Sequence, residues 1–187
     1  MKVAVDFDGT LSDLHTLAIS LINLRHGTTY TVQDISSWGW FKEAGVYETF
    51  QLILDMLDTS YIDRAIPPTS IWACPTVKWL TKRGHDVEIL SSNEPLRAPK
   101  LAAWLFSHGL DTPVRCLGRI SAAEKLRLGH TYFIDDSPEI VQAIASEPGK
   151  HLLLVDRPWN WNCHLTDNIT RVVDWYEMKQ HLEALGL

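Results

Sequence analysis

The sequence has little cysteine and no apolar run long enough to cross a membrane. Its three cysteines, Cys74, Cys116 and Cys163, lie far apart and form no Cys-x-x-Cys pair. This pattern argues against a disulfide framework and is typical of reduced thiols, so we expect a cytoplasmic protein. The acidic residues Asp6 and Asp8 also argue against an N-terminal signal peptide, and we expect no membrane partner.

Basic residues are outnumbered by acidic ones. The chain has 17 Lys and Arg against 23 Asp and Glu, which gives a net charge of −6. This balance argues against a broad nucleic-acid-binding face, although a single local phosphate site stays open. The length of 187 residues, with 45% hydrophobic and 21% charged residues, is typical of one soluble domain or of a domain with a small insert.

The first strand ends in an unusual polar group. Residues 3–5 form a short apolar run that is followed by Asp6, Asp8, Gly9 and Thr10. Unpaired carboxylates beside a core are costly, and two Asp residues at this spacing can point to the same side of a strand end. They indicate a divalent cation site. Taken alone, the same residues also fit a strand that runs into an Asp-Gly turn.

A helical insert is predicted directly after this strand, at residues 12–68. Ser12 is expected to cap a helix over 12–25, and a second apolar periodic segment covers 47–57. The Ile-Pro-Pro run at 66–68 then reads as a linker. Because the insert follows the first strand end, we expect it to lie over that edge as a cap.

Helical and strand patterns alternate after the linker. We expect helices over 71–82, 96–108, 121–128, 137–145 and 172–185, and strands over 87–90, 114–117, 132–134 and 152–155. Five strands with helical crossovers predict an α/β fold with a doubly wound parallel sheet, whose ligands bind beyond the carboxyl ends of the strands. The expected core comprises residues 1–11 and 69–187, and the expected cap residues 12–68.

The polar residues at these strand ends suggest magnesium-assisted phosphoryl transfer. Asp6 could act as the nucleophile, and Asp8 could first protonate the leaving oxygen and then activate water. Ser91 and Lys125 would hold phosphoryl oxygens, and Asp135 would complete a Mg²⁺ site. Each residue alone has an ordinary explanation as a turn, a helix entry or a solvated lysine. Their order at successive strand ends is the specific signal.

These residues resemble the four motifs of the haloacid dehalogenase superfamily of phosphatases. The matching segments are 6–10, Ser91, Lys125 and Asp135-Asp136. The resemblance implies a Rossmann-like core in which Asp6 is the nucleophile. It also implies that Asp6, the backbone carbonyl of Asp8 and Asp135 coordinate magnesium, with Asp136 acting through water or from behind the ligands.

Within that superfamily the chain resembles the small 5′(3′)-deoxyribonucleotidases of cytosolic type C. Lys125 lies ten positions before Asp135, as in that family, and the run at 156–160 (Asp-Arg-Pro-Trp-Asn) resembles its Arg-Pro-aromatic-Asn signature. Gly39-Trp40-Phe41 resembles a step in the family's cap whose rings stack on the nucleobase. The family's cap aromatic after the first motif is Leu14 here.

The resemblance gives a set of expected substrate-binding residues: Gly9, Thr10, Ser92, Trp40 and Phe41. At Gly9 a phosphate could approach the backbone closely. The alternative for Trp40 and Phe41, together with Trp38, is a hydrophobic plug that joins cap to core. For Arg157, we expect contacts that fix the strand-end loop through backbone carbonyls more than a contact with phosphate.

The hypothesis is therefore a Mg²⁺-dependent phosphomonoesterase that hydrolyses (deoxy)nucleoside monophosphates through an aspartyl-phosphate intermediate. One alternative is a phosphatase for another small phosphometabolite or for a nucleic-acid 3′-phosphate end. Another is a non-catalytic phosphate-binding module, which is disfavoured because the nucleophile, the acid and the lysine are all present. We expect a small nucleotide and no long nucleic acid as partner, and a homodimer stays open.

Overall fold

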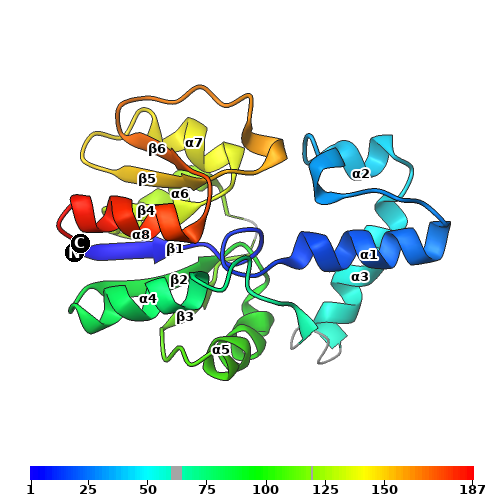
Figure 1. Ribbon diagram of the computed structural model, residues 1–187, viewed down its shortest axis with the longest axis horizontal. Coiled ribbons are helices and arrows are strands. Elements are labelled where there is room, and N and C mark those ends of the chain that lie inside the picture. Colours follow the sequence, from blue (N-terminus) through cyan, green and yellow to red (C-terminus); the bar gives the residue numbers. More distant parts are fainter. Residues whose placement is uncertain (60–64, 119) are drawn as a thin grey trace.

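The structure is a computed structural model that describes residues 1–59, 65–118 and 120–187 (Figure 1). Its centre is a parallel sheet with the strand order β3-β2-β1-β4-β5-β6. The strands are β1 (Lys2–Val5), β2 (Asp86–Ser91), β3 (Val114–Cys116), β4 (Tyr132–Asp135), β5 (His151–Val155) and β6 (Ile169–Val172). The predicted α/β class and parallel sheet are confirmed.

The last strand, β6, is not among the five strands expected from the sequence, which predicts a helix from residue 172. β6 pairs with β5 in parallel register, from Ile169 opposite Leu152 onward. The helix begins only at Trp175, because the side chain of Asp174 accepts the backbone N–H groups of the first turn and caps it. With only four residues and two half-buried positions, this edge strand has too weak an alternation to be recognised.

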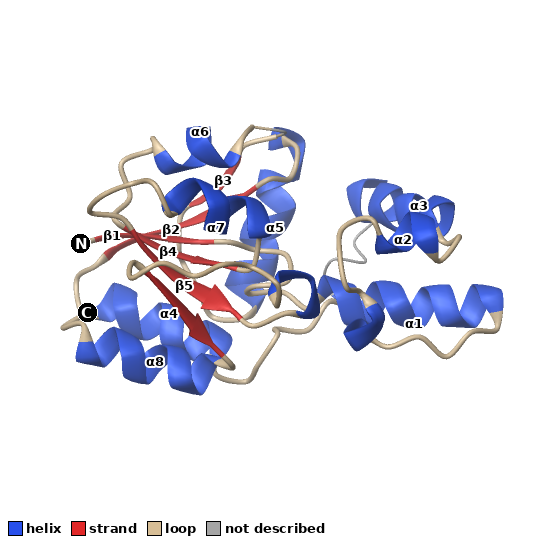
Figure 2. Ribbon diagram, turned by 90° about the horizontal axis from the view of Figure 1, so that it is seen from above, coloured by secondary structure: helices blue, strands red, loops and turns tan. Residues whose placement is uncertain are grey.

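Helices cover both faces of the sheet, as the doubly wound prediction requires (Figure 2). One face packs against α4, α5 and α8, and the other packs against α6 and α7. The helices are α1 (Leu14–His26), α2 (Trp40–Glu43), α3 (Tyr47–Thr59), α4 (Ala73–Lys82), α5 (Ala98–Ser107), α6 (Ala122–Leu126), α7 (Pro138–Ile144) and α8 (Trp175–Ala184). No helix among the described residues is long and apolar enough to span a membrane.

The helices α1, α2 and α3 follow β1 and lie beyond the carboxyl ends of the strands (Figure 1). They have an apolar cluster of their own, which includes Ile22, Phe41 and Ile53 and also takes in Trp159 from the loop after β5. Residues 60–64 of the predicted cap lie outside the described residues. The exact boundary between cap and core stays a prediction.

Helix α1 starts differently from the prediction. Its cap is Asp13, whose side chain accepts from the backbone N–H of Thr16, and its first residue is Leu14. Ser12 instead donates its hydroxyl hydrogen to Asp8, at 3.1 Å. The prediction that Ser12 caps the helix is wrong, because its hydroxyl contributes to the strand-end loop.

Candidate active site

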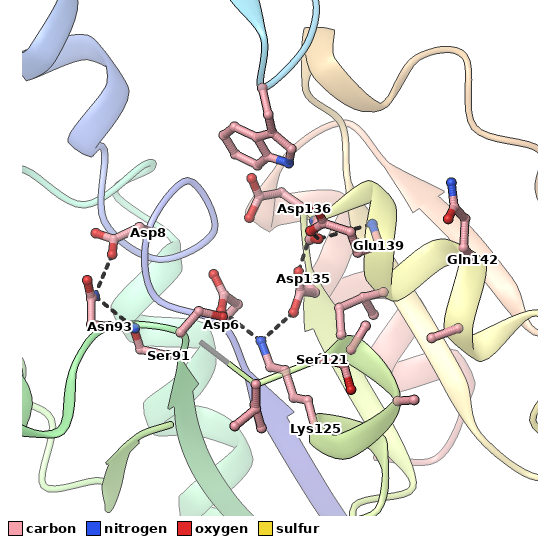
Figure 3. A pocket seen from close by; sticks show the side chains of 18 residues that line it. Asp6, Asp8, Ser91, Asn93, Ser121, Lys125, Asp135, Asp136, Glu139 and Gln142 are labelled. Carbon is pink, nitrogen blue, oxygen red and sulfur yellow. Dashed lines mark hydrogen bonds and ion pairs between the residues drawn. The ribbon is translucent and has the colours of Figure 1, made fainter. Parts of the chain in front are cut away.

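Three strand ends and one helix bring the predicted residues together (Figure 3). β1 lies between β2 and β4, so Asp6 stands between Ser91 and Asp135 at the same edge of the sheet. The backbone N–H of Asp6 continues the pairing by donating to the carbonyl of Ile134, at 2.8 Å. These side chains, together with Lys125 from α6, line one cavity of about 900 Å³.

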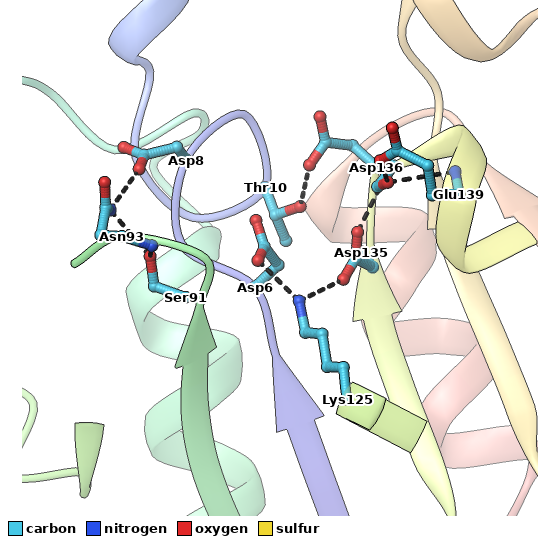
Figure 4. Close-up of polar contacts among 10 residues, drawn as sticks. Asp6, Asp8, Thr10, Ser91, Asn93, Lys125, Asp135, Asp136 and Glu139 are labelled. Atoms are coloured by element: carbon cyan, nitrogen blue, oxygen red, sulfur yellow. Dashed lines mark hydrogen bonds and ion pairs between the residues drawn. The ribbon is translucent and has the colours of Figure 1, made fainter. Parts of the chain in front are cut away.

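Lys125 bridges two of the carboxylates (Figure 4). Its Nζ donates to Oδ1 of Asp6 at 2.8 Å and to Oδ2 of Asp135 at 2.7 Å, and the side chain is 5% exposed. Burial disfavours its charge, but the carboxylates of Asp135 and Asp6 outweigh this effect and raise the pKa of Lys125 above its usual value. The lysine is therefore a fixed cation at the floor of the cavity.

Asp6, Asp135 and Asp136 form a carboxylate cluster suited to a metal ion. One oxygen of each lies within 4.8 Å of the others, and the backbone N–H of Ser137 orients Asp135. Burial raises the pKa of Asp6 well above its usual range and raises that of Asp136 to about 7, where the charge of Asp135 also contributes. Ionising all three carboxyl groups beside a single lysine is therefore unfavourable without a further cation, and hard oxygen donors suit Mg²⁺.

Asp136 is held firmly by its neighbours. Thr10 donates to its Oδ1 at 2.6 Å, the indole N–H of Trp159 donates to its Oδ2 at 2.9 Å, and the amide of Asn160 donates to its backbone carbonyl at 2.9 Å. Both carboxylate oxygens thus already accept a hydrogen bond. The Arg-Pro-Trp-Asn run marks this segment in the sequence, but the contact of Trp159 with Asp136 is seen only in the structure.

The loop that carries the first motif is fixed through its backbone. Gly9 adopts a left-handed conformation with φ of 79°, and a Cβ there would lie 2.6 Å from Oδ2 of Asp136. Glycine is needed for both reasons. Arg157 donates from Nε to the carbonyl of Gly9 at 2.8 Å, and Trp175 donates to the carbonyl of Thr10 at 3.0 Å. The predicted backbone role of Arg157 is confirmed.

Asp8 lies apart from the carboxylate cluster. Its Oδ1 accepts from Ser12 at 3.1 Å and its Oδ2 accepts from the amide of Asn93 at 2.7 Å. Burial raises the pKa of Asp8, against the opposing charge of Arg97 and these hydrogen bonds. A raised pKa suits a residue that gives and takes a proton. Its predicted contact with magnesium stays assigned to its backbone carbonyl.

Of the cap aromatics, two are buried within the cap and one lines the cavity. Trp40 and Phe41 are buried in the apolar cluster of the cap, where Phe41 stacks on Phe50 with ring centroids 3.9 Å apart. Neither lines the large cavity, whereas Ser92 and Trp38 do, and Trp38 is 42% exposed. The hydrophobic-plug alternative fits Trp40 and Phe41, and their stacking on substrate stays a prediction.

Comparisons with known proteins identify the family. The model of the family described as "5' nucleotidase, deoxy (Pyrimidine), cytosolic type C protein" matches residues 1–185. The chain belongs to this family. A Bacillus cereus protein described as "Putative nucleotidase" is 23% identical over 193 residues, which cover 95% of this chain and 96% of that protein.

Solved structures of hydrolases resemble this chain in fold. A haloacid dehalogenase (HAD) family hydrolase from Deinococcus radiodurans R1, solved with bound phosphate and sodium, has a TM-score of 0.67 at 14% identity and covers 99% of this chain and 96% of its own. A HAD phosphatase from Thermococcus onnurineus has a TM-score of 0.58 at 17% identity, with 97% and 98% covered. The chain is a nucleotidase-family hydrolase with a HAD-like fold.

Proposed function

We propose that this nucleotidase is a Mg²⁺-dependent phosphomonoesterase that converts (deoxy)nucleoside monophosphates to nucleoside and phosphate in the cytoplasm. The observation that carries the proposal is the single cavity shared by Asp6, Asp8, Ser91 and Lys125 with the carboxylate cluster. The family description, which names a deoxynucleotide activity and the cytosol, supports the substrate class and the compartment.

In the first step, Asp6 attacks the phosphorus atom. Lys125 occupies Oδ1 of Asp6, so Oδ2 is the attacking oxygen. The new bond joins Oδ2 to phosphorus while the bond from phosphorus to the ester oxygen breaks, and Asp8 gives its proton to that leaving oxygen. Ser91 donates to a phosphoryl oxygen. Mg²⁺ bound by Asp6, Asp135 and the carbonyl of Asp8 would offset the negative charge of the phosphoryl group.

In the second step, water releases the phosphate. Asp8, now a carboxylate, takes a proton from the water as its oxygen bonds to phosphorus, and the bond from phosphorus to Asp6 breaks. The free carboxylate of Asp6 and the protonated form of Asp8 are restored. The same residue serves as acid and then as base, which its burial and raised pKa favour.

The cavity also has room for the organic part of the substrate. Its volume of about 900 Å³ lies within the range of small-molecule sites, and the half-exposed indole of Trp38 forms part of its wall. Stacking of a base on an aromatic ring contributes about 1–3 kcal/mol. We assign Trp38 as a stacking surface for the base.

The test is phosphate release across a panel of substrates, with and without Mg²⁺. The panel contains deoxynucleoside and ribonucleoside 5′- and 3′-monophosphates, a sugar phosphate and a 3′-phosphorylated oligonucleotide. We expect release from nucleoside monophosphates that depends on Mg²⁺ and is lost in Asp6→Asn. Asp111→Asn, which changes an exposed aspartate outside the cavity, is the matched control. Turnover of the sugar phosphate or the oligonucleotide alone would refute the substrate claim.

A further inference from the structure

Asn93 joins two residues of the proposed mechanism that are far apart in sequence. It follows β2, and one side-chain nitrogen, Nδ2, donates to Oδ2 of Asp8 at 2.7 Å and to Oγ of Ser91 at 2.7 Å. Its backbone N–H also donates to Oγ of Ser91, at 3.1 Å. Figures 3 and 4 show the amide between the two side chains.

The orientation of this amide is set by Arg97. The guanidinium, which is 5% exposed, donates from NH1 to Oδ1 of Asn93 at 2.6 Å. Arginine has donors only, so the oxygen of the amide must face it. The NH₂ group of Asn93 must then face Asp8 and Ser91, and one hydrogen is available for each of them.

The hydrogen-bond inventory of Ser91 follows from this orientation. A hydroxyl oxygen has two lone pairs, and Asn93 supplies two donors to it, one from the amide and one from the backbone. The hydroxyl hydrogen of Ser91 is therefore left to donate elsewhere. Ser91 lines the cavity, so a phosphoryl oxygen there is a suitable acceptor.

The same reasoning distinguishes the two oxygens of Asp8. An amide N–H only donates, so Oδ2 stays an acceptor as long as Asn93 binds it. The hydroxyl of Ser12, which contacts Oδ1 at 3.1 Å, can donate or accept. Asp8 can thus carry its proton on Oδ1 without losing either contact.

We propose that Asn93 is a positioning residue for phosphoryl transfer, which orients Asp8 for proton transfer and keeps the Ser91 hydroxyl as a donor to the phosphoryl group. The inference rests on the proposed function. Asn93 does not touch the reacting atoms in this assignment. Its effect reaches the reaction through these two neighbours.

Two substitutions separate the hydrogen bonds from packing. Asn93→Ala removes the whole amide, whereas Asn93→Asp keeps its shape and an acceptor for Arg97 but cannot donate to Asp8 or Ser91. The control is Asn168→Ala, which removes an amide that bridges the carbonyls of Ile144 and Lys150 away from the cavity. Circular dichroism confirms that each variant is folded before its kinetics are measured.

The kinetic readout is kcat/KM on two phosphate esters with Mg²⁺ present. A nucleoside monophosphate needs a proton on its leaving oxygen, but p-nitrophenyl phosphate has a good leaving group that does not. We expect both Asn93 variants to lose about 10- to 100-fold on the nucleotide, the same order as for residues that orient metal ligands, and clearly less on the aryl ester. Asn168→Ala should match the wild type. Unchanged kcat/KM, or equal losses on both esters, would overturn the proposal.

A second readout does not depend on turnover. Calorimetric titration with inorganic phosphate, at saturating Mg²⁺, should show weaker binding to both Asn93 variants because Ser91 loses its fixed orientation. Titration with Mg²⁺ alone should be unchanged, since Asn93 contacts none of the clustered carboxylates. If the wild type hydrolyses neither ester while phosphate binding still depends on Asn93, the proposed function fails and the orientation of Ser91 stands. Equal phosphate binding in all variants would overturn the inference.

Discussion

The indole N–H of Trp159 donates a 2.9 Å hydrogen bond to Oδ2 of Asp136, so a loop after β5 holds one corner of the carboxylate cluster. Trp159→Phe keeps an aromatic ring and removes only the donor. We expect its Mg²⁺ affinity to fall about tenfold, the lower end of the effect of partners that orient metal-site carboxylates. Calorimetric titration with Mg²⁺ measures this change. Trp161→Phe is the control, because Trp161 bonds Asp156 instead. Equal affinities would contradict the assignment.

Trp38 is expected to matter for binding and not for the chemical step. Trp38→Ala removes the half-exposed ring from the cavity wall, so the KM for a nucleoside monophosphate should rise about tenfold, as expected for a loss of stacking worth about 1–3 kcal/mol. The kcat should change little. Trp72→Ala is matched in exposure, at 43%, and lies outside the cavity. If both variants behave alike, Trp38 does not contact the base.

Lys125 should support stability as well as activity. Lys125→Met removes the cation between Asp6 and Asp135 and leaves buried carboxylates without their partner. Breaking a buried pair costs about 3–5 kcal/mol, so the free energy of unfolding should fall by that order in the absence of metal. Urea titrations with and without Mg²⁺ test this, and Mg²⁺ should restore part of the loss. An unchanged urea midpoint without metal would argue against the lysine's structural role.

The burial of His15 should make the protein less stable at acidic pH. Its ring packs against Trp38 and Trp159, with centroid distances of 5.7 and 4.4 Å. Burial, aided by the charge of Arg157, lowers the pKa of His15 from 6.5 to about 3. Between these values the unfolded chain binds a proton that the folded chain does not. The free energy of unfolding therefore decreases as the pH is lowered below 6.5, by up to about 1.4 kcal/mol per pH unit. Above pH 6.5 this contribution of His15 to stability is fully present.

The matched variant for this prediction is His15→Phe, which keeps a ring and cannot titrate. Urea unfolding of both proteins from pH 7 to pH 4 should give curves that diverge, with the wild type losing stability more steeply. Both proteins must be measured without metal, because metal binding to the carboxylates also depends on pH and would change the measured stability. Parallel pH dependence would show that His15 accepts a proton readily in the folded protein.

The sequence was sufficient to predict the edge of the sheet where the chemistry lies. Asp6 and Asp135 follow apolar runs that form the neighbouring strands β1 and β4, and the spacing of ten positions between Lys125 and Asp135 matched the family pattern. What it could not supply were side-chain contacts between loops. Asn93 meets Asp8 across 85 positions, and neither residue type nor period indicates such a pairing. The sequence also could not separate Trp38 from Trp40 and Phe41, because burial decides which of these three aromatic side chains faces the cavity.

The position of Trp159 has a thermodynamic consequence. One ring belongs to the apolar cluster of the cap and also donates to a carboxylate of the predicted metal site. Coupling between two equilibria is reciprocal. If docking of the cap strengthens magnesium binding through this ring, then bound magnesium stabilises the docked cap by the same free energy. Metal binding at the strand ends and docking of the cap helices are then thermodynamically coupled.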